Sequence, residues 1–254
     1  MEILMVTFKQ WHDEDLTFNN EMKIYFCQCD LKSNLILTEL LRITTDSAVD
    51  DYNQRGMSYK FLQEHDMAVL VSRVAFTIHK MPVANELITI RTWEEKPEPL
   101  QLMRAYEITD RDGSKLVSGL SAWLVVHYQS HKIIRTKDFT LRPEPNRSEM
   151  HDCPYPGKIV VTEELRPLGE HSIGNSDIDA NGHVNSSRYG AFAIDALPET
   201  YLQKEIKGFR LNYSKEAKKG SNLSLYGAFN DTSNKVTVVG KQAGSICFES
   251  EFLF

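Results

Sequence analysis

Cysteine is scarce in this 254-residue chain, and its spacing excludes a disulfide framework. The four cysteines are Cys27, Cys29, Cys153 and Cys247. Two of them stand in one Cys-x-Cys pair, and no second pair follows at the spacing of a zinc site. We therefore interpret all four as buried thiols of a protein in a reducing cytosol. We expect neither a bound metal nor a cofactor.

The sequence also lacks a long apolar run and an excess of positive charge. No stretch approaches the length of a membrane span, and the amino terminus has no basic segment followed by an apolar core. The net charge of −6 argues against nucleic acid as the main partner, because phosphate binding needs a basic surface. We expect a cytoplasmic globular protein with neither a membrane nor a nucleic-acid partner.

The first half of the chain predicts one long helix followed by an antiparallel sheet. Apolar residues recur at three-to-four spacing over residues 33–58, until Gly56 interrupts the pattern. Strand-like segments then follow at 68–79, 86–94, 102–110 and 116–128, with a hairpin turn between the last two. An α+β layout is the simplest reading of this order.

A proline-rich segment separates this half from a second one of similar layout. Residues 142–157 contain four prolines among polar residues, which disfavour a helix or a central strand. We therefore predict domains at 1–141 and 158–254, joined by a linker at 142–157. The second half predicts a helix from about 183 to 198 and strands at 206–214, 222–229, 235–242 and 245–254.

The two halves read as copies of one unit. Residues 74–82 match residues 209–217 in pattern at an offset of 135 positions. A helix wrapped by an antiparallel sheet, present twice, is the layout of a tandem double hotdog, in which the two sheets join. Two unrelated α+β domains are the alternative. Met81 stands where the second copy has Glu216, so we expect only the second half to be equipped for catalysis.

A polar cluster precedes the predicted second helix. Asp179, Asn181 and His183 bring a carboxylate, an amide and an imidazole into one turn. Free backbone N–H groups and the positive end of a helix would stabilise a negatively charged transition state there. Ordinary turn and cap residues beside a helix-start histidine would give the same pattern. Both readings stay open on these residues alone.

These segments resemble the acyl-acyl carrier protein thioesterases of plant plastids and bacteria. Residues 177–185 resemble the family signature Asp-Leu-Asp-x-Asn-x-His-Val-Asn-Asn, and Tyr189 follows at the family's distance. Residues 211–217 resemble the strand end at which a glutamate completes the catalytic set. The Thr-Trp pair at 92–93 and the Ser-x-Trp pair at 121–123 also stand where the family has them. The resemblance covers nearly the whole chain.

Three positions depart from the family pattern. Ser186 replaces the second asparagine of the signature, Phe192 replaces a tryptophan, and Ala217 replaces a cysteine found in plant members. An alanine cannot be a nucleophile, so thiol chemistry at residue 217 is excluded. The lack of a plastid-targeting extension leads us to expect a bacterial, cytoplasmic member.

The resemblance implies hydrolysis of a fatty acyl thioester of acyl carrier protein, which ends chain elongation. We expect Glu216 to deprotonate water or to attack directly, with His183 facing and orienting it. Asn181 would hold the water or the thioester, and Asp179 would fix the side chain of Asn181. Backbone N–H groups just after His183 would bind the oxyanion. Without the resemblance, Glu216 among its neighbouring lysines would read as part of a solvated charged face.

The family resemblance also predicts where the substrate binds. The acyl chain is expected in an apolar tunnel of the first half, and the candidate lining residues are Leu37, Leu41, Val49, Met67 and Met81. Plain core packing is the alternative for each of them. The acidic carrier protein is expected to dock on a basic patch made of Lys204, Lys207, Arg210, Lys215, Lys218 and Lys219. A homodimer is possible.

Three other functions remain open on the sequence alone. A thioesterase of the same fold acting on coenzyme A esters would use the same cluster. A double hotdog that binds acyl chains without hydrolysing them would not need the four polar residues to converge. A hotdog dehydratase is disfavoured by the signature at 177–185. Neither the acyl chain length nor its saturation can be read from these residues.

Overall fold

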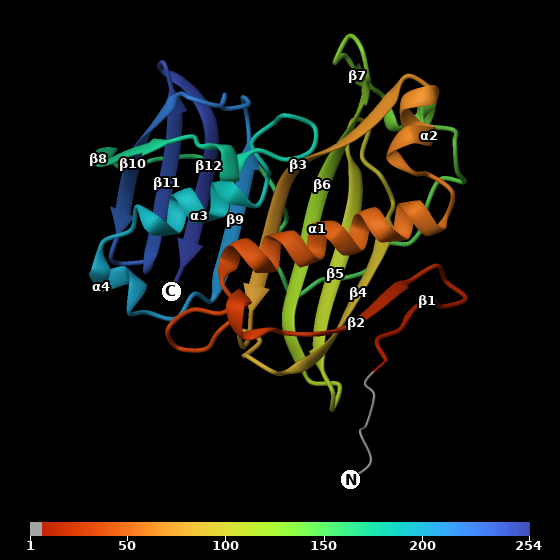
Figure 1. The fold of residues 1–254 in the computed structure, drawn as a ribbon, viewed down its shortest axis with the longest axis horizontal. Coiled ribbons are helices and arrows are strands. Elements are labelled where there is room, and N and C mark those ends of the chain that lie inside the picture. The colour runs from red at the N-terminus through yellow and green to blue at the C-terminus, as the bar shows by residue number, and fades with distance from the viewer. Residues whose placement is uncertain (1–6) are drawn as a thin grey trace.

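The computed structural model describes residues 7–254, which form one antiparallel sheet with the main helices on one face (Figure 1). The strand order is β1-β2-β4-β5-β6-β3-β9-β12-β11-β10-β8, with β7 paired to β6. The strands of the first half are β1 (Gln10–His12), β2 (Phe18–Lys23), β3 (Met67–Ile78), β4 (Leu87–Glu95), β5 (Leu102–Asp110), β6 (Lys115–His127) and β7 (Ile133–Ile134). Those of the second half are β8 (Arg166–Ser172), β9 (Gly208–Tyr213), β10 (Asn222–Asn230), β11 (Lys235–Gln242) and β12 (Ser245–Leu253).

The helices divide between the two halves. The first half contains α1 (Leu37–Gln54) and α2 (Tyr59–Glu64), and the second contains α3 (Arg188–Asp195) and α4 (Glu199–Leu202). Short 3-10 turns lie at Phe26–Gln28, Thr136–Asp138 and Asn175–Asp177. No helix within residues 7–254 is both long and apolar enough to cross a membrane.

Strands β3 and β9 join the two halves into one sheet. Their antiparallel register pairs Val74 with Leu211, Ala75 with Arg210 and Phe76 with Phe209. Ala75 and Arg210 are themselves 135 positions apart, the offset of the sequence repeat. The two copies are therefore related by a pseudo-twofold axis through this pair. The predicted tandem double hotdog is confirmed, although α3 is shorter than expected.

The helices of the two halves pack against each other as well. Gly190 of α3 lies so close to α1 that an added Cβ atom would stand 2.5 Å from Cδ1 of Leu41. Leu37 and Leu40 on the same helix are also buried. Burial of each such leucine contributes about 1.5–3 kcal/mol to stability. One apolar core consequently extends through both halves of the protein.

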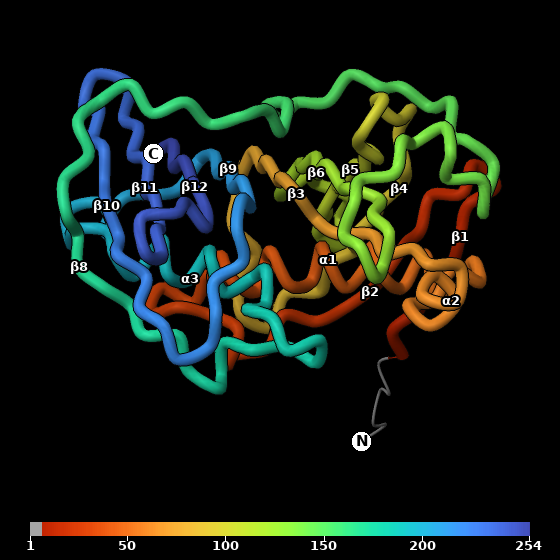
Figure 2. The backbone as a smooth tube through the Cα atoms, turned by 90° about the horizontal axis from the view of Figure 1, so that it is seen from above, coloured from red at the N-terminus to blue at the C-terminus, as the bar shows by residue number. Residues whose placement is uncertain are grey.

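The segment between the halves covers the face of the sheet opposite to α1 and α3 (Figure 2). Residues 139–165 form neither helix nor strand. Arg147 lies 4.2 Å above the ring of Trp93 and pairs with Asp15 at 2.9 Å, and His151 lies 3.0 Å from Glu95. Cys153 of the same segment packs against the cluster that contains Ala105 of β5 and Leu120 of β6, so these two strands are largely buried on both faces. The predicted domain limits at 141 and 158 stay a prediction. Residues 1–6 of the first predicted domain lie outside the described range.

Several predicted element ends were wrong for local reasons. The first helix begins at Leu37 instead of residue 33, because residues 29–35 form a turn with Ser33 at a φ of 64°. It ends at Gln54, two residues before Gly56 at a φ of 81°. The second helix begins at Arg188, five residues after His183. Strands β1, β2, β7 and β8 were not predicted: β1 and β7 have only three and two residues, β8 is mostly exposed, and β2 is mostly polar in sequence.

The cysteines are free, but they are not all buried. Cys247 is buried, whereas Cys27 is exposed and the other two are half-buried. Cys27 lies in an exposed 3-10 turn that also presents Phe26 to solvent. The prediction of four buried thiols was therefore wrong for Cys27, because this turn projects away from the core.

A charged cluster, which we call the charged floor, lies beneath the C-terminal part of α1. Its members are Asp51, Tyr52, Arg55, Glu94, Arg104 and Arg142. Asp51 is fully buried and accepts a hydrogen bond from Arg104 at 2.7 Å. Burial alone would raise the pKa of this carboxyl, but Arg104 and Arg55 hold it below its ordinary value. Arg104, Arg142 and Arg55 likewise lower the pKa of Glu94 against the effect of burial.

We predict that Asp51→Asn lowers the free energy of unfolding at pH 7 by about 3–5 kcal/mol, because it leaves a buried guanidinium without its anion. A lowered folded-state pKa stabilises the protein above the unfolded value of about 4, and the effect is lost as the pH falls through the folded value. The variant should therefore differ less from the wild type in acid. Denaturant unfolding at several pH values measures both effects.

Glu64→Gln is the control for this prediction. Glu64 pairs with Lys60 at 3.9 Å on the exposed side of α2, and such a pair contributes less than about 1 kcal/mol. Equal losses in the two variants would contradict the assigned role of the charged floor.

Candidate active site

The cluster foreseen at 177–185 forms a tight turn whose conformation is fixed by Asp179. We call residues 178–184 the site loop; Ile178 and Val184 pair across its ends. The Asp179 carboxylate accepts the backbone N–H groups of Asn181 at 2.8 Å and of His183 at 3.2 Å. The side-chain bonds of Asp179 thus hold the backbone of the loop, and not the Asn181 side chain that the sequence analysis assigns to it.

His183 and Glu216 face each other, as the sequence predicted. Nδ1 of His183 lies 3.4 Å from Oε1 of Glu216, and both side chains are about half exposed. This separation exceeds the usual 2.7–3.2 Å of an N–H···O bond, but catalytic hydrogen bonds are often long before substrate binds. The contact through Nδ1 leaves Nε2 of the imidazole open to a substrate or to water.

Two buried groups support this pair from below. The hydroxyl of Tyr189 accepts the backbone N–H of Ala217 at 3.1 Å and so holds the strand end that carries Glu216. Burial raises the pKa of Tyr189 to about 12, so the phenol is neutral at pH 7. The buried carboxylate of Asp177 accepts bonds from the Gly174 N–H at 2.8 Å and from Nε of Arg188 at 2.9 Å. Asp177 thereby ties the site loop to the start of α3.

One large cavity begins at this site and extends into the first half. Its volume is about 1000 Å³. Asp179, Asn181, His183 and Glu216 all line it, so the structure brings the four predicted residues to one cavity. The first half contributes walls from α1, α2, β3, β5 and β6, among them Ala48, Val49, Leu102 and Trp123. Polar groups that could act on a carbonyl therefore open onto a largely apolar space.

The predicted cavity wall was only partly right. Val49 lines the cavity. Leu37 and Leu41 are buried in the main core instead, and Met81 packs against that core. Met67 packs against a smaller apolar cluster next to the cavity. Leu37 and Leu41 do not line the cavity, because the residues of α1 that border it lie further along the helix, at 45–53. Met67 and Met81 stand at the first residue of β3 and beyond its last one.

Five tyrosines that the sequence analysis did not assign to the site also line the cavity: Tyr52, Tyr59, Tyr128, Tyr189 and Tyr213. The hydroxyls of Tyr59 and Tyr128 lie 3.3 Å apart. The five tyrosines come from α1, α2, the end of β6, α3 and β9, so no local pattern marks them as neighbours. Only the spacing of Tyr189 behind the signature gave a signal.

The expected oxyanion donors are not all available. The N–H of Asn185 is bonded to the carbonyl oxygen of Asp177 at 2.8 Å. Because α3 begins only at Arg188, its positive end does not directly follow His183. The Asn181 side chain lines the cavity, and its amide is a suitable donor to a carbonyl oxygen.

The predicted basic patch divides into separate groups. Lys215, Lys218 and Lys219 stand next to Glu216 at the end of β9, whereas Lys204 and Lys207 precede the start of that strand. The distance from residue 207 to residue 215 along an extended strand is roughly 26 Å. The patch is therefore not one surface.

The sixth member of the predicted patch lies in the middle of β9. Arg210 pairs with Glu251 at 3.2 Å and donates to the carbonyl of Gly157 at 2.8 Å. Its guanidinium is thus held beneath the connecting segment, and its side chain is only 20% exposed. Arg210 is unsuited to docking an acidic protein.

Two further features near cavities carry no catalytic group. Cys247 lines the large cavity, but burial raises its pKa, which keeps the thiol protonated and a weak nucleophile.

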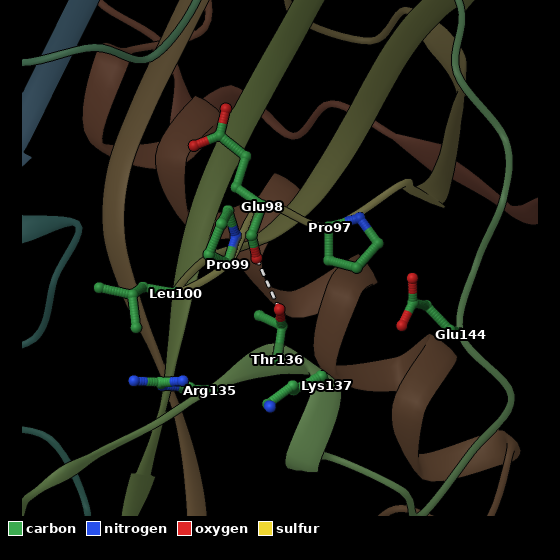
Figure 3. Close-up of a pocket in the computed structure, with 8 residues that line it drawn as sticks. All are labelled: Pro97, Glu98, Pro99, Leu100, Arg135, Thr136, Lys137 and Glu144. Atoms are coloured by element: carbon green, nitrogen blue, oxygen red, sulfur yellow. Dashed lines mark hydrogen bonds between the residues drawn. The ribbon is translucent and has the colours of Figure 1, made fainter.

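A separate hollow of about 560 Å³ lies between the β4–β5 turn and Thr136–Asp138. There Thr136 donates to the carbonyl of Glu98 at 2.6 Å (Figure 3). The hollow holds no histidine and lies apart from His183 and Glu216.

Comparison with protein families gives matches over both halves. Residues 15–142 match the acyl-ACP thioesterase N-terminal domain, and residues 169–244 match the acyl-ACP thioesterase C-terminal domain. A chloroplastic acyl-acyl carrier protein hydrolase of Cuphea viscosissima is 24% identical over 175 residues, which are 63% of this chain and 40% of the relative. A chloroplastic palmitoyl-acyl carrier protein thioesterase of Arabidopsis thaliana is 21% identical over 168 residues, or 61% of this chain and 39% of the relative. The matches thus span about two fifths of these relatives.

Solved structures show the same architecture over almost the entire chain. An acyl-ACP thioesterase from Bacteroides thetaiotaomicron superposes with a TM-score of 0.85 at 25% identity, covering 94% of this chain and 97% of that one. The 12:0-ACP thioesterase of Umbellularia californica gives a TM-score of 0.75 at 14% identity, with 93% and 96% covered. The second likeness concerns the fold alone.

We predict that Tyr189→Phe loosens the strand end at Glu216, because the Ala217 N–H loses its buried acceptor. Leaving such a group unpaired costs about 1–3 kcal/mol. Hydrogen exchange of the Ala217 amide should speed up by about tenfold or more, which corresponds to at least 1.4 kcal/mol. Tyr201→Phe is the control, since that hydroxyl bonds to Asp231 far from Glu216. Unchanged exchange at Ala217 in Tyr189→Phe would refute the supporting role.

Proposed function

Because this chain belongs to the acyl-ACP thioesterase family, we propose that it hydrolyses the thioester bond of a fatty acyl-acyl carrier protein and releases the free acid. The observation that carries the proposal is the joint position of four polar residues at one cavity. Asp179, Asn181, His183 and Glu216 all border a space of about 1000 Å³ whose remaining walls are largely apolar. A thioester at the polar end would place its acyl chain inside the first half.

The proposed reaction uses water as the nucleophile. Glu216 takes a proton from the water as its oxygen attacks the thioester carbonyl carbon, while His183 orients the carboxylate through Nδ1. The amide of Asn181 donates to the developing oxyanion. When the carbon–sulfur bond breaks, the thiolate leaves and takes up a proton from the pair. Asp179 acts through the loop backbone and positions both Asn181 and His183.

Direct attack by Glu216 is the alternative route, and it would form a mixed anhydride with the acyl group. Label that appears in the Glu216 carboxylate after hydrolysis in isotopically labelled water identifies the anhydride route. In the water route, one turnover labels the released acid and leaves the Glu216 carboxylate unlabelled. In the anhydride route, the side chain becomes labelled when water attacks the Glu216 carbonyl carbon of the anhydride.

Acyl carrier protein is the proposed acyl donor, in preference to coenzyme A. Both matched family domains are named for acyl-ACP thioesterases. Lys215, Lys218 and Lys219 also provide positive charge beside Glu216, to which an acidic protein could bind. The contact between His183 and Glu216 argues against a protein that binds acyl chains without hydrolysing them, because such a protein does not need this contact. A cytoplasmic location and a possible homodimer accompany the proposal as predictions.

We predict that Glu216→Gln and His183→Ala each reduce kcat/KM for acyl-acyl carrier protein by about a hundredfold or more, the scale of lost acid–base catalysis. Release of free thiol measures the rate. Glu205→Gln is the control, because Glu205 is exposed and pairs with Lys207 at the far end of β9. Full activity in either site variant would contradict the mechanism, and faster hydrolysis of the coenzyme A ester by the wild type would reassign the donor.

We predict that Lys215→Glu combined with Lys218→Glu raises KM for acyl-acyl carrier protein by about tenfold, because it reverses charge where the carrier would dock. The same variant should hydrolyse an acyl-pantetheine ester at the wild-type rate. Lys204→Glu combined with Lys207→Glu is the matched control and should change neither rate. Steady-state kinetics at two salt concentrations measures the effect, and an equal loss in both double variants would refute docking at the end of β9.

A further inference from the structure

The far end of the large cavity is polar, although its middle is apolar. Tyr52, Glu94 and Arg104 of the charged floor line the same cavity as His183 and Glu216. Strand β5, which carries Arg104, stands three strand spacings from β9, roughly 14 Å, and β4 with Glu94 stands four, roughly 19 Å. The polar groups therefore lie at the opposite end of the cavity from the reacting pair.

This separation suits the length of a medium acyl chain. An extended chain of tetrahedral atoms advances roughly 1.2 Å per bond. A chain of roughly twelve carbons would therefore span the distance from the thioester to Arg104. Between these ends it would contact apolar residues such as Val49, Leu102 and Trp123. Its terminal atoms would then meet the charged floor.

At this end of the cavity, the guanidinium of Arg104 has more N–H donors than the hydrogen bonds that it makes. It donates to Thr92 Oγ1 at 3.2 Å and to Asp51 Oδ2 at 2.7 Å. Within residues 7–254 the Arg104 side chain makes these two hydrogen bonds, whereas a guanidinium carries five N–H donors. The side chain is only 5% exposed. An N–H group at such a depth is stabilised by an acceptor that enters the cavity.

The charged floor also contains more positive than negative side chains. Arg55, Arg104 and Arg142 share the carboxylates of Asp51 and Glu94, so three cations face two anions. His12 contacts Asp51 as well and adds no negative charge. A floor that served only to stop a hydrocarbon chain would need no ions, because apolar side chains would fill the space at lower desolvation cost.

We propose that the charged floor binds an oxygen group at the far end of the acyl chain, either a terminal hydroxyl or a terminal carboxylate. Arg104 would donate to that oxygen. The Tyr52 hydroxyl, which donates to Glu94 at 2.7 Å, would accept a hydrogen bond from a terminal hydroxyl. This inference rests on the proposed function, because it assigns the substrate class of the same site. It makes the enzyme selective for acyl chains oxygenated at their end.

The test compares three acyl-acyl carrier proteins of twelve carbons that end in a methyl, a hydroxyl or a carboxylate. We expect kcat/KM for at least one oxygenated chain to exceed that for the plain chain by about tenfold or more, the scale of one hydrogen bond to a charged group. The two oxygenated arms distinguish the hydroxyl from the carboxylate. Equal rates, or preference for the plain chain, would overturn the inference.

Two variants locate the effect at the floor. Arg104→Lys keeps a cation beside Asp51 but removes the planar fork of donors, so the preference for the oxygenated chain should fall to near one. Tyr52→Phe removes one hydroxyl and is the milder variant should Arg104→Lys fail to fold. Tyr52→Phe should weaken the preference for the chain with a terminal hydroxyl, but not the preference for the chain with a terminal carboxylate. A carboxylate has no proton to donate to the Tyr52 hydroxyl. A preference that survives both changes would place the binding site elsewhere.

A binding measurement separates this inference from the proposed function. The free twelve-carbon acids compete with a fluorescent fatty acid for the wild-type protein, and this readout needs no hydrolysis. Tighter competition by the oxygenated acids would support the floor even if no thioester were cleaved. Hydrolysis of all three substrates without any preference would refute the floor and leave the proposed function intact.

Discussion

The pairing of β3 with β9 is the interaction on which the rest of the structure depends. It converts two small sheets into one and removes two strand edges that would otherwise stay unpaired. It also brings Glu216, just beyond the end of β9, beside the space between α1 and the first sheet. The close approach of Gly190 to Leu41 fixes the two helices in the same relation. Neither half alone would combine the reacting pair with the cavity.

The same turn is built twice, but only one copy carries reactive groups. In the first half the carboxylate of Asp30 accepts the N–H of Asn34 at 2.9 Å, and residues 29 and 35 pair across the turn as residues 178 and 184 do. Asn34 therefore stands where the site loop has His183, and the sequence repeat places Met81 where the second copy has Glu216. The conformation is retained in both copies because it starts the helix, whereas the chemistry is present in one.

Much of the fold could be predicted from the sequence because burial on one or both faces imposes a clear pattern. Strand β5 was predicted to the residue, and the joined sheets followed from the repeat. The edge strand β8 was missed because Pro167 and Gly169 interrupt a mostly exposed segment. At the site, the motif predicted the contact of His183 with Glu216. The cavity wall was harder to predict, because the first turns of α1 pack in the main core and its later turns border the cavity, while one helical pattern runs through both.

The central claim is that the reacting pair and the acyl cavity act as one site across the two halves. A crystal structure of Glu216→Gln with a non-hydrolysable acyl-pantetheine analogue tests this claim most directly. The account predicts electron density for the carbonyl beside Asn181 and His183, and for the chain along Val49 and Trp123 in the first half. A chain lying wholly in the second half, or a carbonyl away from His183, would contradict it.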